Sequence, residues 1–138
     1  MPKTRTLNKL ADDLAVAMQK HVRLKEAVAN PLGFCECVTC NKKKHWKEMQ
    51  GGHFIERCKA HKTLEENIHS QCPYCNQYGM KRASVVLTYR RYMVDMYGEK
   101  FVMWLEESAN DVVKRFRPDL VKEIKDLRAR NRQLEAEL

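Results

Sequence analysis

Two pairs of cysteines constrain the fold of this chain more than any other feature. Cys37 and Cys40 form one CxxC pair, and Cys72 and Cys75 form the other. Two such turns can present four thiolates to one tetrahedral ion, which is how closed structural zinc sites are built. We therefore predict one structural Zn²⁺ per chain, bound by these four side chains.

Two further cysteines, Cys35 and Cys58, complicate the choice of ligands. Cys35 lies close enough in sequence to reach the same metal, but the two-residue spacing of Cys37 and Cys40 is the usual one and matches the second pair. Cys35 and Cys58 are therefore predicted to be ordinary thiols. Paired CxxC spacing without a secretory signal favours a metal site over a disulfide framework.

The segment between the two pairs is long enough to hold a second site. It has 31 residues between Cys40 and Cys72, whereas a simple zinc ribbon has about 15–20. The segment includes His53, Arg57, Asn67 and His69. These residue types activate water, hold a phosphate and orient an imidazole. The combination predicts a nuclease.

The motifs of this segment resemble a known family. They are Gly52-His53 with Arg57 four residues later, Glu65-Glu66-Asn67-Ile68-His69, Cys75-Asn76, Tyr89-Arg90-Arg91 and Tyr97-Gly98. In this combination, residues 34–107 resemble the phage lambda NinG (Rap) recombination nucleases. More distantly, the segment is similar to the zinc-clamped HNH nucleases, including phage endonuclease VII, a Holliday-junction resolvase in which a CxxC pair is also followed directly by Asn.

The resemblance implies both a fold and an activity. The expected fold is α+β and mainly helical, with a zinc-stabilised HNH (ββα-metal) module flanked by an N-terminal helix and by C-terminal helices that end in a short coiled coil. The expected activity is metal-dependent endonuclease cleavage of branched DNA, such as D-loops or Holliday junctions. Two alternatives are a non-catalytic zinc module that binds DNA or a recombination partner, and a less selective HNH nuclease.

Four residues are the predicted catalytic set. Neutral imidazole titrates near pH 6.5, so His53 can accept a proton from the attacking water. Arg57 would neutralise the phosphate. The resemblance further implies that Asn67 fixes the hairpin or His53 through its amide, and that Asn76 coordinates a catalytic Mg²⁺ or Mn²⁺ through its side-chain oxygen.

The metal ligands depart from the wider HNH class at one position. Many HNH enzymes carry an acidic ligand just before the catalytic histidine, and here that position is Gly52. A hard cation bound by Asn76 alone would be held weakly, so another ligand must help. Glu65, Glu56 and His69 are the candidates, and we favour His69 and Glu65 because they fall in the NinG-like motif.

The charge of the chain favours a polyanionic partner. The formal net charge is +8, with an excess of +3 in residues 1–30, +5 in residues 31–98 and none in residues 99–138. Such a balance suits DNA and makes binding salt-dependent. The predicted DNA contacts are Lys42, Lys43, Lys44, Arg82, Arg90 and Arg91. The alternative for the three lysines is a solvated turn.

The chain is expected to have three parts: an N-terminal amphipathic helix (residues 1–30), the zinc-clamped HNH-like nuclease domain that the resemblance implies (residues 31–108), and a C-terminal helix that forms the coiled-coil segment (residues 109–138). The first is an amphipathic helix over residues 6–29 that stops at Asn30-Pro31, because proline cannot continue the hydrogen-bond ladder. In the second, a helix should end at Gly98 and a short one should continue through Glu107. A further helix should start at Pro118.

The last helix carries a seam of apolar residues with one polar member. The seam consists of Leu120, Ile124, Leu127, Asn131, Leu134 and Leu138. Steps of four and three residues are typical of a coiled coil, so residues 118–138 are predicted to form a homodimer. The alternative is an amphipathic helix that packs on its own domain.

No apolar run approaches the length of a membrane span, and the polar N-terminus lacks the apolar region of a signal peptide. We therefore expect a cytoplasmic protein, in the host cell if the chain is phage-encoded.

Overall fold

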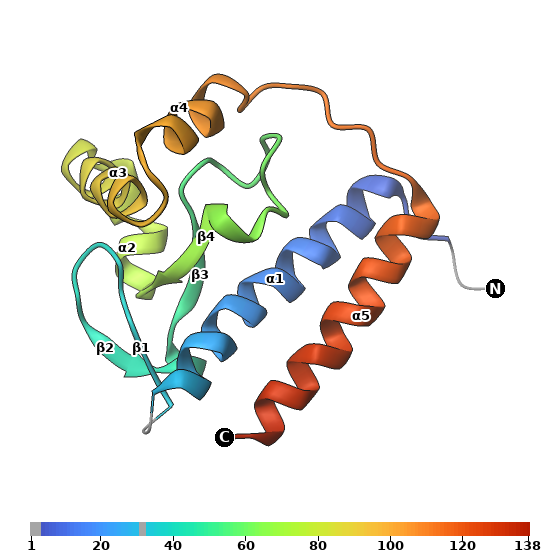
Figure 1. The fold of residues 1–138 in the computed structure, drawn as a ribbon, viewed down its shortest axis with the longest axis horizontal. Coiled ribbons are helices and arrows are strands. Elements are labelled where there is room, and N and C mark those ends of the chain that lie inside the picture. Colours follow the sequence, from blue (N-terminus) through green and yellow to red (C-terminus); the bar gives the residue numbers. More distant parts are fainter. Residues whose placement is uncertain (1–3, 31–32) are drawn as a thin grey trace.

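The computed structural model describes residues 4–30 and 33–138. It is mainly helical with two small antiparallel sheets, as the sequence predicts in outline (Figure 1). The helices are α1 (Leu7–Ala29), α2 (Pro73–Gln77), α3 (Ala83–Tyr97), α4 (Glu99–Glu107) and α5 (Arg117–Ala136). The strands are β1 (Phe34–Glu36), β2 (Lys43–His45), β3 (Gln50–His53) and β4 (Ile68–Gln71). Single 3₁₀ turns are η1 (Trp46–Glu48), η2 (Glu65–Asn67) and η3 (Gly79–Lys81).

Helix α1 begins and ends close to the predicted residues. The Thr6 side chain accepts a hydrogen bond from the Lys9 amide at 3.1 Å, which satisfies one of the free donors of the first turn. The helix ends at Ala29. Pro31, to which the sequence assigns this ending, lies outside the described residues.

The centre of the fold is a hairpin that continues directly into a helix. β3 pairs with β4 in antiparallel register, with Gln50 opposite Gln71 and His53 opposite Ile68. The long connection between them, residues 54–67, contains η2, and α2 follows β4 after a single residue. Because the strands are antiparallel, the end of β4 and the start of α2 lie beside the start of β3, and α2 packs against β3.

Helix α1 packs against both strands of this hairpin (Figure 1). The approach is close at Gly51, where a Cβ atom would lie 2.6 Å from the Cβ of Gln19. Glycine at this position therefore allows the hairpin to contact the helix, and the same contact brings α1 to the edge of the candidate site described below.

Helix α5 lies alongside α1 (Figure 1). Leu120 and Ile124 pack against Leu10 and Leu14. Buried Asn131 donates from Nδ2 to the carbonyl of Ala17 at 3.0 Å. The predicted seam thus faces a helix of its own chain, which is the alternative left open by the sequence. A zipper between two chains through residues 118–138 would require α5 to leave α1.

The remaining helices form a second core around Tyr89. Tyr89 and Met93 of α3 are fully buried against Val102 and Leu105 of α4. α3 ends at Gly98 and α4 at Glu107, as predicted. Residues 109–116 then run as an extended segment to α5 (Figure 1). Within the described part of the chain, no helix is both long enough and apolar enough to cross a membrane.

Candidate metal centre and catalytic pocket

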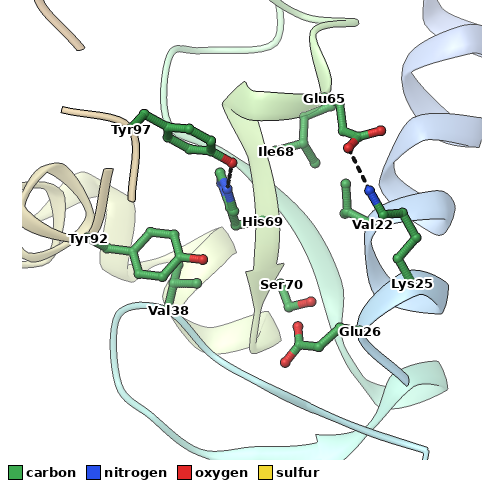
Figure 2. Close-up of a pocket in the computed structure, with 10 residues that line it drawn as sticks. All are labelled: Val22, Lys25, Glu26, Val38, Glu65, Ile68, His69, Ser70, Tyr92 and Tyr97. Atoms are coloured by element: carbon green, nitrogen blue, oxygen red, sulfur yellow. Dashed lines mark hydrogen bonds and ion pairs between the residues drawn. The ribbon is translucent and has the colours of Figure 1, made fainter. Parts of the chain in front are cut away.

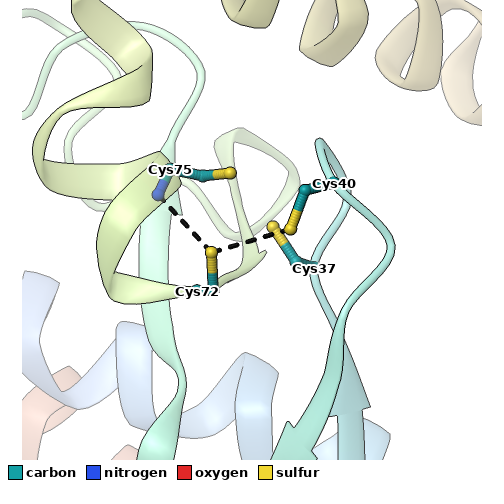
Figure 3. Close-up of side chains that lie close together, drawn as sticks. All are labelled: Cys37, Cys40, Cys72 and Cys75. Carbon is teal, nitrogen blue, oxygen red and sulfur yellow. Dashed lines mark hydrogen bonds between the residues drawn. The ribbon is translucent and has the colours of Figure 1, made fainter.

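The two CxxC pairs meet in the structure. The four Sγ atoms all lie within 4.8 Å of one another, and those of Cys40 and Cys72 are 3.7 Å apart (Figure 3). Zn–S bonds of about 2.3 Å in a tetrahedral site separate the sulfurs by about 3.8 Å. The four cysteines are therefore close enough to hold a structural metal such as zinc.

Local backbone structure presents the sulfurs. After β1, the Asn41 amide donates to the carbonyl of Cys37 at 2.9 Å, and Asn41 adopts a positive φ of 64°, which closes a tight turn. In the second pair, Cys72 caps α2, and its Sγ accepts from the Cys75 amide at 3.4 Å. Pro73 sits in the first turn of α2, where its missing N–H has no helical partner to lose.

The surroundings of the four sulfurs favour the thiolate form of Cys37. Burial alone would raise the pKa of Cys37, but hydrogen bonds from the Thr39 hydroxyl and nearby backbone groups lower that pKa to about 6. Burial raises the pKa of Cys75 to about 12. The thiolate is the form that binds metal.

The other two cysteines lie apart from this cluster. Cys35 is buried and donates to the carbonyl of Arg23 at 3.3 Å, and burial raises its pKa to about 11. Cys58 is exposed. Neither belongs to the four-sulfur group found among the described residues, in agreement with the choice made from the spacing.

Three of the four predicted catalytic residues share one pocket, which we call the His53 pocket. Its volume is about 540 Å³. His53 comes from the end of β3, Arg57 from the following loop and Asn76 from α2. Gln19 of α1 and the side chains of Glu56 and Lys81 also line it.

A backbone carbonyl fixes the protonation of His53. Its Nε2 lies 2.8 Å from the carbonyl oxygen of Lys62. A carbonyl oxygen only accepts, so Nε2 carries the proton and Nδ1 is the basic nitrogen. Burial lowers the pKa of His53, and the Arg57 charge acts in the same direction, so the ring is neutral at pH 7.

One guanidinium nitrogen of Arg57 is hydrogen-bonded and another is not. Its Nη2 donates to the carbonyl of Asp12 in α1 at 3.0 Å. Its Nε is buried and has no hydrogen-bond partner among the described residues. An unpaired buried donor costs about 1–3 kcal/mol. Arg57 lines the His53 pocket, so its positive charge lies close to any anion that enters, which suits a phosphate.

Asn67 lies outside the pocket and holds the loop that follows His53. Its Oδ1 accepts from the Ile55 amide at 2.8 Å, and its Nδ2 donates to the carbonyls of Ile55 and His61, both at 3.0 Å. The side chain is fully buried. Asn67 therefore acts on His53 and Arg57 through the backbone that carries them.

The favoured ligand set for the catalytic ion is not brought together. Asn76 lines the His53 pocket, and its Nδ2 donates to Oε1 of Gln50 at 2.8 Å, so that its Oδ1 is left for a cation. Glu65 and His69 line a different pocket (Figure 2). Glu56, the candidate that we did not favour, shares the pocket with Asn76.

The surroundings of His69 and Glu65 explain their separate location. Nε2 of His69 lies 2.7 Å from the Tyr97 hydroxyl (Figure 2). Its Nδ1 lies 3.2 Å from the Tyr89 hydroxyl, so both ring nitrogens are used. Burial lowers the pKa of His69 to about 4. Glu65 pairs with Lys25 at 2.9 Å (Figure 2). His69 is thus a packed neutral side chain.

The position before His53 has no room for an acid. A Cβ atom at Gly52 would lie 1.7 Å from Oε1 of Gln71. Sequence reasoning missed this glutamine, as well as Gln50 and Gln19, because an amide on a strand or helix resembles any other polar surface residue. The one available signal was their position: Gln50 begins one strand of the hairpin that carries His53, and Gln71 ends the other.

None of the six predicted DNA-binding residues lines the His53 pocket. Lys42 and Lys43 are exposed beside β2, and Lys44 is half-buried. Arg82 and Arg91 are exposed on α3 or at its start. Arg90 donates to Glu99 at 2.8 Å and to Glu106 at 2.9 Å, so its charge is already paired. Lys81, which was not predicted, does line the pocket.

The whole chain matches a known protein family. The family model described as "Bacteriophage Lambda NinG protein" matches residues 2–137. The match includes the four clustered cysteines, the His53 pocket and both α1 and α5, so it extends beyond the central motifs. No curated protein and no solved structure matches the chain.

Proposed function

Because the chain belongs to the bacteriophage lambda NinG protein family, we propose that it is a metal-dependent DNA endonuclease of phage recombination, with its active site in the His53 pocket. Family membership supports a role in phage recombination. The observation that carries the catalytic proposal is that His53, Arg57 and Asn76, from three separate segments, line one pocket. The preference for branched DNA rests on the family resemblance.

The order of elements supports an HNH-type module. A strand carries the histidine, a long loop follows, and a second strand leads into a helix that carries Asn76. The four cysteines hold the β1–β2 turn against the start of that helix, which suits one structural Zn²⁺. A small module of this kind has little core, and a metal offsets that deficit.

The proposed reaction is hydrolysis of a phosphodiester. Nδ1 of His53 takes a proton from water, the water oxygen forms a bond to phosphorus, and the bond from phosphorus to the 3′ oxygen breaks. The leaving oxygen takes its proton from solvent. Arg57 lines the pocket, and its positive charge stabilises the charge that is added to the phosphate.

The donors in the pocket fit a divalent ion that substrate completes. Asn76 offers Oδ1 and Glu56 a carboxylate, and Mg²⁺ commonly binds through one or two protein oxygens with water and substrate phosphate as the other ligands. When bound, Mg²⁺ or Mn²⁺ would neutralise charge on the phosphate and the leaving oxygen. The chain's own contribution is to hold these two oxygens beside His53.

The test is cleavage of labelled linear duplex, D-loop and four-way-junction DNA with Mg²⁺ or Mn²⁺. Wild type should cut the branched substrates. The variant His53→Ala should cut them about 10²–10⁴-fold more slowly, because a general base contributes that much, while its DNA affinity is retained. His45→Ala, on β2 and outside the pocket, serves as the matched control and should cut normally.

Two results would change this proposal. Binding without cutting by wild type, under both metals, would indicate a non-catalytic zinc module. Equal cutting of linear and branched DNA would indicate a less selective HNH nuclease.

A further inference from the structure

Helices α1 and α5 border two grooves, one on each side of their contact. One groove, which we call the basic groove, is lined by Val16, Lys20, Arg128 and Arg132. The other, the opposite groove, is lined by Met18, Glu123, Asp126 and Arg130. A helix turns 100° per residue, so Arg128 and Arg132 fall on one side of the buried stripe through Ile124 and Asn131, and Glu123 and Asp126 fall on the other side. The balanced charge of residues 99–138 therefore conceals a basic side and an acidic side of α5.

The positive charge of the basic groove is largely uncompensated. Arg128 and Arg132 have no ion pair within the described part of the chain. Lys20 pairs with Glu135 at 3.1 Å, a contact between exposed side chains. The acid that lines the groove, Asp13, is already bound to Arg5 at 2.6 Å and to Lys9 at 3.1 Å.

The basic groove borders the His53 pocket through a single turn of α1. Gln19 lines the His53 pocket, and the next residue, Lys20, lines the groove. Val16, one turn earlier, is exposed on the groove side. The opposite groove is lined by Leu14 of α1 and by Thr63 of the loop after His53, and it shares no lining residue with the His53 pocket.

We propose that the basic groove binds the phosphate backbone of the duplex arm that flanks the scissile phosphate. The proposal rests on the nuclease function proposed above and adds α5 to the DNA-binding surface. Arg128 and Arg132 are about 6 Å apart along the helix axis, so they can contact different phosphates. Contacts of this kind position a duplex without reading its sequence.

The experiment measures DNA affinity rather than cleavage. Zinc-loaded protein without added Mg²⁺ or Mn²⁺ is titrated into fluorescent four-way-junction DNA at several salt concentrations. The double variant Arg128→Gln/Arg132→Gln should bind roughly tenfold more weakly at about 0.1 M salt, and the slope of log K against log salt should fall by about two. Arg130→Gln, on the same helix but in the opposite groove, should bind like wild type.

If the double variant has the melting temperature of wild type, its weaker DNA binding is not a folding defect. Benzoylphenylalanine at Val16 should photocrosslink to the DNA, whereas the same group at Glu123 should not. If the double variant and Arg130→Gln bind equally well, the groove proposal is overturned, whether or not wild type cuts DNA. Groove-dependent binding by a protein that never cuts would support the groove and overturn the nuclease.

Discussion

The contact between Gly52 and Gln71 decides which ligands the catalytic pocket can offer. Gln71 is fully buried, and its Oε1 occupies the space that a Cβ at position 52 would need. The proposed catalytic ion would therefore need oxygens from other elements, and Glu56 and Asn76 are two that line the pocket. The sequence shows that the usual acid is absent at position 52, but the reason lies in a side chain 19 positions later.

His69 should make folding stability depend on pH. Burial lowers its pKa to about 4 from an ordinary value of 6.5, so the unfolded chain binds more protons between these values. The stability that neutral His69 contributes should therefore be complete above pH 6.5. The free energy of unfolding should fall as the pH decreases towards 4. We expect His69 to contribute on the order of 2 kcal/mol to that loss.

This contribution can be isolated by comparing urea unfolding of wild type and His69→Gln between pH 7 and pH 4.5. Loss of metal at low pH affects both proteins equally, so the difference in slope reports His69. Equal slopes would mean that the Tyr97 and Tyr89 contacts do not hold the ring neutral.

At the scale of elements, the sequence predicted helices better than it predicted side-chain partners. The start of α1 and the end of α3 follow from local chemistry at Thr6 and Gly98. The split between Asn76 and His69 depends on how the hairpin packs against α3, where Tyr89 and Tyr97 reach His69. No local pattern contains that information.

The β1–β2 turn and α2 should depend on one metal. We expect one zinc per chain by elemental analysis, and a chelator should lower the melting temperature. Cys72→Ser should have the same effect, because it removes one metal-binding thiolate, while the serine hydroxyl can still cap α2. Cys58→Ser, at an exposed cysteine outside the cluster, should melt like wild type and keep its zinc. Full stability of zinc-free protein would contradict this prediction.

At the scale of the whole molecule, α5 is part of the core. The heptad-like spacing predicted the buried positions Leu120, Ile124 and Asn131, whereas the last seam residue, Leu138, is exposed. The spacing could not name the partner of α5, because Leu10 and Leu14 of α1 offer the same apolar surface as a second chain would. Asn131 illustrates the ambiguity. A polar residue in such a seam is typical of coiled-coil dimers, yet here it bonds to Ala17 of α1.

Deleting residues 117–138 distinguishes the two roles of α5. Losing Leu120 and Ile124 alone should cost about 2–5 kcal/mol each, a large part of the stability of a typical domain. We therefore expect the shortened chain to lose cooperative thermal unfolding, followed by circular dichroism. A folded monomer, seen by sedimentation equilibrium beside a dimeric full-length protein, would instead support a zipper between chains.

The contact between α1 and α5 also determines when the newly made protein can complete its folding. Residues 30–116 must be translated after α1 and before the first turn of its partner, which takes on the order of ten seconds at about 5–20 residues per second. Until then the leucine face of α1 is exposed, and the nascent chain depends on the ribosome or on chaperones to prevent non-specific association of that face. A ribosome that stalls before α5 would therefore release a chain that cannot finish folding.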